Sequence, residues 1–217
     1  MTAKYIADTI VSILSDNEDL LEIAFRQRAK FEGWLKFEIA KEFQKSGKAT
    51  KVEYPIAKVY ADLVADKVLP ELYRNTEVER LIQRGHVDLF ADNCLIELKT
   101  PNTNYTCEGV DSKTRPITKN VNDIIYDINK LRELRNITDK LGELRKNPKG
   151  PRYDSFIAFV MFPIDKDKDE DKNTTSKYME HVNRIENHIQ APGLQIIKDE
   201  REVTIKSIPA LVYVAKV

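Results

Sequence analysis

The chain has 217 residues, 41% of them hydrophobic, which is enough for one sizeable core, and we expect a single domain over residues 1–217. Lysine plus arginine and aspartate plus glutamate both number 35, so there is no general basic field and any nucleic-acid surface must be a local patch. Cys94 and Cys107 are too few for a disulfide framework, and no leader-like or membrane-spanning apolar run occurs. We therefore expect a soluble, cytoplasmic protein without a membrane partner.

Two helices are predicted at the start of the chain. Apolar residues at helical spacing predict a short helix over residues 2–14. A long helix is predicted over residues 18–46, because few breakers occur before Gly47 supplies a C-terminal stop. Two of its glutamates are candidate site residues: Glu32 lies in the apolar stripe, and Glu38 lies near its edge, where a carboxylate could reach a cleft.

Both glutamates also have an ordinary structural interpretation. Glu32 lies one helical turn from Lys36 and from Arg28, either of which could neutralise it. Glu38 lies beside Lys41 and could be a solvated surface residue. The sequence leaves open which glutamate, if either, belongs to a site.

The next segments predict a strand and an insertion. Residues 50–59 predict a first strand that ends or bends at Pro55. Residues 60–83 return to a helical pattern, which we interpret as a helical insertion between strands.

A β-hairpin is predicted over residues 85–100, because two short apolar runs flank Ala91-Asp92-Asn93. One strand carries Asp88 and the other carries Glu97 and Lys99. Residues two apart on a strand share a face, so Glu97 and Lys99 point to the same side and their apolar neighbours to the other. Three ionisable groups in apolar strands therefore converge near one sheet edge.

Basic residues gather around the hairpin in sequence. Residues 101–119 are polar and too long for a tight connection, and such loops are usually functional or mobile. Residues 122–144 predict a helix that packs on the sheet and carries lysine and arginine on its opposite face, which is also the composition of a solvated helix face. The candidate phosphate-binding residues are Arg84, Lys113, Arg115, Lys119 and Lys130.

The C-terminal third contributes compatible elements but no second site. His181 and His188 lie two helical turns apart without a third ligand nearby, so no metal site is predicted there. The predicted elements are a buried strand over residues 155–164, a charged loop over 165–172, a helix over 175–190, and terminal strands over 203–208 and 210–217 around Pro209.

The predicted fold is α/β, a mixed central β-sheet flanked by helices. Within it, Asp88 followed by Glu97-Leu98-Lys99, behind a glutamate-bearing helix and ahead of a helix packed on the sheet, resembles the PD-(D/E)xK nuclease superfamily, with its restriction-endonuclease-like fold. The resemblance covers residues 20–162 in element order. Val87 stands where the family has a proline.

A triplet of an acidic residue, any residue and a lysine is by itself a common pattern in a chain with 32% charged residues. Asp111-Ser112-Lys113 and Glu170-Asp171-Lys172 also satisfy it, but only Glu97-Leu98-Lys99 lies in an apolar strand. The combination with Asp88 and an upstream glutamate is what makes the resemblance specific.

The resemblance implies a metal-dependent nuclease that hydrolyses phosphodiester bonds in DNA, with restriction or another defence role as the expected context. Asp88, Glu97 and the Leu98 carbonyl would hold Mg²⁺, which Mn²⁺ could replace, because hard oxygen ligands suit these ions. Lys99 would orient or help deprotonate water and stabilise negative charge. Glu32 or Glu38 would complete the site.

Two alternatives remain at the level of sequence. The same charges could form a salt-bridged set in which Lys99 only compensates Asp88 and Glu97, and the chain could be a catalytically inactive nucleic-acid- or protein-binding module of the same fold. The sequence does not decide the oligomeric state, although a symmetric homodimer is a common arrangement for cutting two strands.

Overall fold

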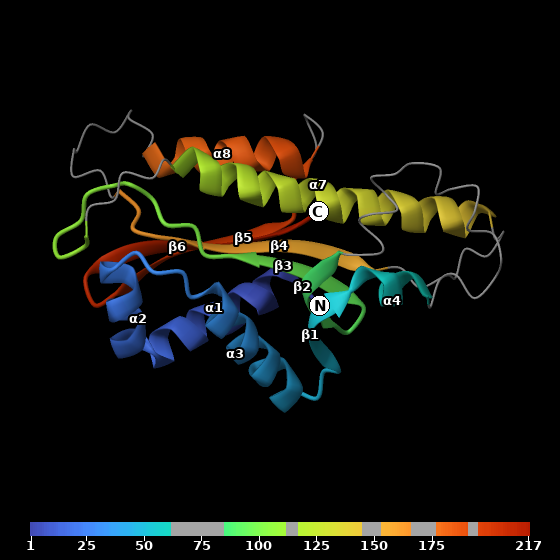
Figure 1. Ribbon diagram of the computed structural model, residues 1–217, viewed down its shortest axis with the longest axis horizontal. Coiled ribbons are helices and arrows are strands. Elements are labelled where there is room, and N and C mark those ends of the chain that lie inside the picture. Colours follow the sequence, from blue (N-terminus) through green and yellow to red (C-terminus); the bar gives the residue numbers. More distant parts are fainter. Residues whose placement is uncertain (62–84, 112–116, 145–152, 166–176, 191–194) are drawn as a thin grey trace.

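In the computed structural model, the chain folds into a mixed six-stranded β-sheet with helices on both faces (Figure 1). The structure describes residues 1–61, 85–111, 117–144, 153–165, 177–190 and 195–217. The strand order is β1-β2-β3-β4-β6-β5, in which only β3 and β4 are parallel neighbours. The predicted α/β class, a mixed sheet flanked by helices, is confirmed. Within the described residues, no helix combines the length and apolar character needed to cross a membrane.

Three helices open the chain, and strands and helices are mixed in the rest of it. The strands are β1 (Thr50–Pro55), β2 (His86–Ala91), β3 (Cys94–Lys99), β4 (Asp154–Met161), β5 (Lys198–Ile205) and β6 (Ile208–Lys216). The helices are α1 (Ala3–Asp16), α2 (Glu18–Arg26), α3 (Glu32–Lys45), α4 (Ile56–Ala61), α7 (Ile117–Leu144) and α8 (Lys177–Ile189).

Two hydrophobic cores lie on the two faces of the sheet. Helices α1, α2 and α3 cover one face and α7 and α8 the other, below and above the sheet in Figure 1. The hairpin strands contribute to both cores: Ile96 and Leu98 of β3 are buried on the α1–α3 side, and Leu95 is buried on the α7 side. Alternation along β3 therefore turns Glu97 and Lys99 to one face of the sheet, as the sequence predicts, and α7 lies on that face.

The prediction of one helix over residues 18–46 is wrong. The chain forms two helices, α2 and α3, separated by a break at which Arg28 has φ +50°. The Arg28 side chain is buried, and its guanidinium donates hydrogen bonds to the carbonyls of Asp111 (2.5 Å), Tyr105 (2.7 Å) and Thr103. These contacts with a distant loop favour the break over a continued helix.

The region around the hairpin follows the prediction with one shift. Strand β1 ends at Pro55 and the hairpin turns at Asp92–Asn93, as expected. The helix predicted over residues 122–144 begins earlier, at Ile117, because Ile117 and Val121 extend its buried stripe by a turn. Most of the predicted insertion over residues 60–83 lies outside the described residues.

The C-terminal hairpin turns at a different place from the one predicted. Its turn is Lys206–Ser207, both with positive φ, and Pro209 lies inside β6 opposite Thr204. Pro209 has no N–H to donate, but its carbonyl accepts a hydrogen bond from the N–H of Ile164 at 2.9 Å. The predicted buried strand is confirmed as β4, which lies between β3 and β6.

Candidate active site at the fork of the hairpin

The sheet forks at the hairpin, and the fork brings its charged residues together. The register pairs of β2 with β3 run from Ala91–Cys94 to Leu89–Ile96 and stop there. Beyond that point β2 continues along β1, and β3 continues along β4 as far as Lys99. The backbone N–H of Leu98 donates to Asp88 Oδ2 at 2.7 Å, so a carboxylate replaces the strand partner that β3 has lost.

The neighbouring strand β1 changes face at the same level. Val52 and its partner Leu89 pack on the α1–α3 side, whereas Tyr54 and its partner Val87 pack on the α7 side. Glu53 lies between them with φ +48°, a conformation that costs a residue with a side chain about 1–2 kcal/mol. Strain of this kind concentrates at functional sites, and here it lies beside the fork.

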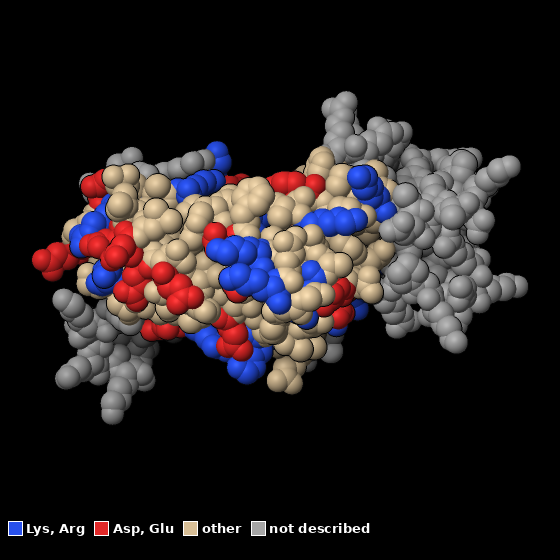
Figure 2. Space-filling view, turned by 90° about the horizontal axis from the view of Figure 1, so that it is seen from below, with Lys and Arg blue, Asp and Glu red and all other residues tan. Residues whose placement is uncertain are grey.

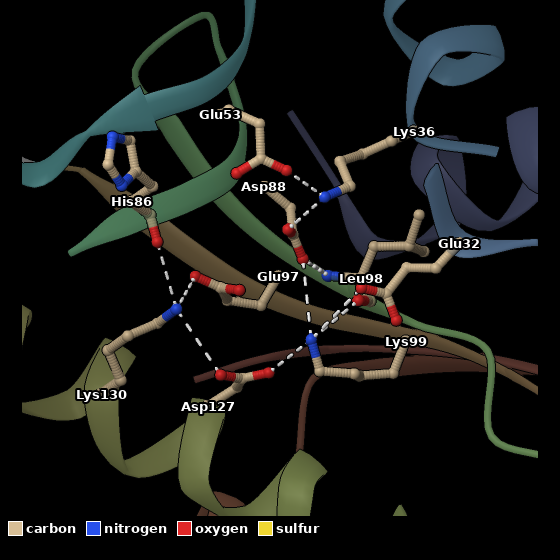
Figure 3. Close-up of polar contacts among 10 residues, drawn as sticks. All are labelled: Glu32, Lys36, Glu53, His86, Asp88, Glu97, Leu98, Lys99, Asp127 and Lys130. Atoms are coloured by element: carbon tan, nitrogen blue, oxygen red, sulfur yellow. Dashed lines mark hydrogen bonds and ion pairs between the residues drawn. The ribbon is translucent and has the colours of Figure 1, made fainter. Parts of the chain in front are cut away.

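Eight charged residues from five elements form a connected set of ion pairs at the fork, which we call the hairpin cluster (Figure 3). Helices α3 and α7 approach it from opposite faces of the sheet. The members are Glu32 and Lys36 of α3, Glu53 of β1, Asp88 of β2, Glu97 and Lys99 of β3, and Asp127 and Lys130 of α7.

Asp88 is the best-satisfied carboxylate of the cluster. Its Oδ1 lies 2.7 Å from Lys36 Nζ, which also contacts Glu53, and its Oδ2 accepts from the Leu98 N–H. Burial alone would raise the pKa of Asp88, but the hydrogen bonds from Lys36 and Leu98 outweigh it, and the pKa lies below its usual value. Asp88 is therefore a carboxylate at neutral pH.

Lys99 lies at the centre of the cluster and joins its two sides. Its Nζ is 2.9 Å from Asp127 Oδ2, 3.5 Å from Glu32 Oε1 and 4.0 Å from Asp88 Oδ2. Burial alone would lower the pKa of Lys99, but Asp127, Glu32 and Asp88 outweigh it and raise the pKa above its ordinary value. Lys99 is thus an ammonium at neutral pH.

Glu97 is the most deeply buried acid of the cluster, with 2% of its side chain exposed. Its Oε1 lies 2.5 Å from Lys130 Nζ, and Lys130 also lies 3.5 Å from Asp127 Oδ1. Burial raises the pKa of Glu97 well above its usual value despite the contact with Lys130. Glu97 Oε1 and Asp127 Oδ2 are buried. Each lies at ion-pair distance from a lysine ammonium group, but neither accepts a well-aligned hydrogen bond.

The structure separates the two candidate glutamates. Glu32, at the first position of α3, reaches Lys99 and belongs to the cluster, and burial raises the pKa of its carboxyl. Glu38 pairs with Lys41 at 2.7 Å and lies outside the cluster, as in its ordinary structural interpretation. Lys36 pairs with Asp88 and Glu53, and the Arg28 guanidinium donates to loop carbonyls.

The candidate basic residues have different outcomes. Lys130 does not lie on a solvated helix face: it is a nearly buried partner of Glu97. Lys119 is exposed near the start of α7. Arg84, Lys113 and Arg115 lie outside the described residues. The Leu98 carbonyl is placed at the cluster, 3.3 Å from Lys99 Nζ.

Sequence reasoning missed three members of the cluster. Asp127 follows Ile124 by three residues in the buried stripe of α7, and an acid in such a stripe is a usable signal. Lys36 holds the same kind of position in α3, where it was considered only as a partner of Glu32. Glu53 gave no signal, because its role depends on the backbone conformation of β1.

The cluster carries more negative than positive charge. Its five carboxylates and three ammonium groups leave a formal charge of −2 when all are ionised, which equals the charge that one divalent cation would neutralise. No group of three or more His, Cys, Asp or Glu side chains in the described part of the chain is arranged as a ready cage for a metal ion. The acids are held instead by lysines.

The chain matches no protein-family model, and neither the curated proteins nor the solved structures give a significant match. Its chemistry must therefore be inferred from the side chains of the hairpin cluster.

Proposed function

We propose that the chain is a metal-dependent nuclease that hydrolyses phosphodiester bonds in DNA, with the hairpin cluster as its active site. The observation that carries the proposal is the convergence of Asp88, Glu97 and Lys99 at the fork, joined by Glu32 from α3. Buried charge networks add little net stability and are commonly retained for a function.

The order of elements supports the PD-(D/E)xK assignment. Along the chain come helix α3, strand β1, helix α4, the hairpin strands β2 and β3, helix α7 and strand β4, which is parallel to β3. This is the order expected from the resemblance: a glutamate-bearing helix, the acidic hairpin, and a helix packed on the sheet. We infer a restriction-endonuclease-like fold from it.

The residues of the cluster fit a Mg²⁺ ion. Mg²⁺ keeps several waters and is usually held by one or two carboxylates together with substrate phosphates, so a cage of three side chains is not required. Asp88, Glu97 and the Leu98 carbonyl would hold it, and the excess of carboxyl over ammonium groups in the cluster favours a cation. When bound, the ion would neutralise phosphate charge and lower the pKa of an attacking water.

Lys99 would act as a fixed positive charge. Its raised pKa makes it a poor proton acceptor while its ammonium is held by Asp127 and Glu32. It is better suited to orient water and to stabilise the negative charge that develops on the phosphoryl oxygens. The side chains of Lys99 and Glu32 are each 23% exposed, the largest fraction among the cluster members other than Glu53, so the substrate would approach from their side.

The contact with DNA would be local. On the face that carries α1–α3, lysines and arginines are interspersed with acids and do not form one basic field (Figure 2). Lys119, near the start of α7, is an exposed candidate for a phosphate contact, and we retain Arg84, Lys113 and Arg115 as candidates from the sequence. Affinity that falls steeply with salt concentration is expected if these cations bind phosphates, and a flat salt response would contradict that assignment.

The direct test is cleavage of plasmid DNA. We expect cutting in Mg²⁺ or Mn²⁺, no cutting after chelation, and a loss of about 100-fold or more in Glu97→Gln, because the variant removes a buried metal ligand. Glu186→Gln is a matched control, since Glu186 also meets a lysine, Lys198, at 2.5 Å but lies at the other end of the sheet. Metal-independent cutting, or full activity of Glu97→Gln, would refute the proposal.

The choice between the two α3 glutamates gives a second test. Glu32→Gln should lower the rate of cleavage at least about tenfold, because it removes a charge that holds Lys99. Glu38→Gln should leave the rate within about twofold, because its ion pair with Lys41 is a surface pair. The cleavage rates of both variants are measured under the same conditions. A larger loss in Glu38→Gln than in Glu32→Gln would assign Glu38, and not Glu32, to the site.

A second function is favoured by one observation: every acid of the cluster already has a lysine partner. Such a set suits a catalytically inactive nucleic-acid- or protein-binding module of the same fold. That function predicts metal-independent retardation of DNA or RNA in a gel and no cleavage of any substrate. The excess of two carboxylates over lysines favours the enzyme.

A further inference from the structure

The Lys130 ammonium is the cation that lies against Glu97 in the hairpin cluster. It lies 2.5 Å from Glu97 Oε1, 3.5 Å from Asp127 Oδ1 and 3.2 Å from the carbonyl oxygen of His86 (Figure 3). Two carboxylates and a backbone carbonyl are the kinds of oxygen that hard divalent cations bind. The ammonium thus serves as a tethered monovalent cation at Glu97.

Glu97 cannot serve this ammonium and a divalent ion at the same oxygen. Two cations at one carboxylate oxygen repel each other strongly, and the side chains here are shielded from water, with 12% of Lys130 and 2% of Glu97 exposed. The lysine has a flexible four-carbon stem, and its hydrogen bond to the His86 carbonyl is exposed to solvent. It can therefore leave Glu97 without a movement of α7.

We propose that Lys130 is the resident counter-cation of Glu97, which a divalent metal displaces, so that Lys130 sets the metal affinity of the site. The inference rests on the proposed function, because it requires Glu97 to be a metal ligand. The lysine stabilises the metal-free cluster, in which Glu97 would otherwise be buried without a positive partner. The displaced ammonium stays beside the site, where an incoming phosphate supplies a new partner.

Lys130→Met tests the exchange with Mn²⁺ alone as the probe. Its affinity for Mn²⁺, measured by titration calorimetry in the absence of DNA, should be at least about tenfold higher than that of the wild type, because the competing charge is gone. Lys130→Arg keeps the charge and should bind Mn²⁺ no more tightly than the wild type. Lys198→Met, which removes a paired lysine at the other end of the sheet, should match the wild type.

The variants also distinguish failure of this inference from failure of the proposed function. Equal or weaker Mn²⁺ binding by Lys130→Met, with wild-type binding that is lost in Glu97→Gln, overturns the exchange and leaves the metal site intact. No Mn²⁺ binding by the wild type or by Lys130→Met overturns both. If Lys130→Met does not fold, Lys130→Gln, which keeps a donor for Glu97 without the charge, carries the same expectation and the same contrary result.

Discussion

Lys99→Ala is expected to lower the rate of DNA cleavage by about 100-fold or more while the protein stays folded. The substitution removes the ammonium that joins Asp127, Glu32 and Asp88, and with it the positive charge available to the developing phosphoryl oxygens. The fold should persist because the side chain is partly exposed and Lys36 and Lys130 still compensate Asp88 and Glu97. Single-turnover cleavage of a labelled duplex in saturating Mg²⁺ measures the effect.

Lys48→Ala is the matched control for this variant. Lys48 pairs with Asp92 in the turn of the same hairpin, at 3.1 Å, and lies outside the hairpin cluster. The Lys48→Ala variant should cleave DNA at the wild-type rate within about twofold, because such surface ion pairs contribute little to stability. Thermal unfolding of both variants excludes a loss of structure as the cause. Full activity of Lys99→Ala would remove Lys99 from the catalytic assignment.

The local features of the site could be predicted from sequence because short-range chemistry determines them. Alternation of apolar and charged residues predicts both strands of the hairpin, and Asp92–Asn93 tolerates the positive φ of its turn. The same alternation places Glu97 and Lys99 on one face. The fork could not be predicted, because it depends on β2 following β1 while β3 follows β4.

The sequence also does not predict which charged residues pair with each other inside the cluster. The sequence favours a phosphate contact or a solvated position for Lys130 on the helix face opposite the sheet, yet its ammonium reaches Glu97. Glu32 lies one helical turn from Lys36, but the two residues turn to partners on different strands. Neighbours on a helix predict a pair only when no better partner lies across the interface, and one sequence does not show those partners.

The break between α2 and α3 also depends on long-range contacts that one sequence does not show. It leads to the prediction with the largest effect on stability. Arg28→Met is expected to lower the free energy of unfolding by about 2–4 kcal/mol. Arg28 is 2% exposed, and its guanidinium donates to carbonyls 75, 77 and 83 residues away in sequence. Methionine preserves much of the volume but leaves those carbonyls without this donor.

The loss should extend to the hairpin cluster, because hydrogen bonds tie the junction between α2 and α3 to the ends of β3 and α7 near it. The Asn102 side chain donates to the Arg28 carbonyl at 2.9 Å, and the Asn120 side chain donates to the Asn102 carbonyl at 2.7 Å. This chain of hydrogen bonds connects the segment before Glu32, the end of β3 and the start of α7. Arg28→Met should therefore also slow cleavage at temperatures where it is fully folded.

Urea unfolding followed by circular dichroism measures the change, with two matched variants. Arg28→Lys keeps the charge but cannot donate to three carbonyls from one planar group, so it should recover less than half of the loss. Arg26→Met removes a neighbouring arginine that contacts the same loop at Gly109 from an exposed position, and it should cost less than about 1 kcal/mol. If Arg28→Met is no less stable than Arg26→Met, the buried guanidinium does not hold the loop, and the break in the helix must have another cause.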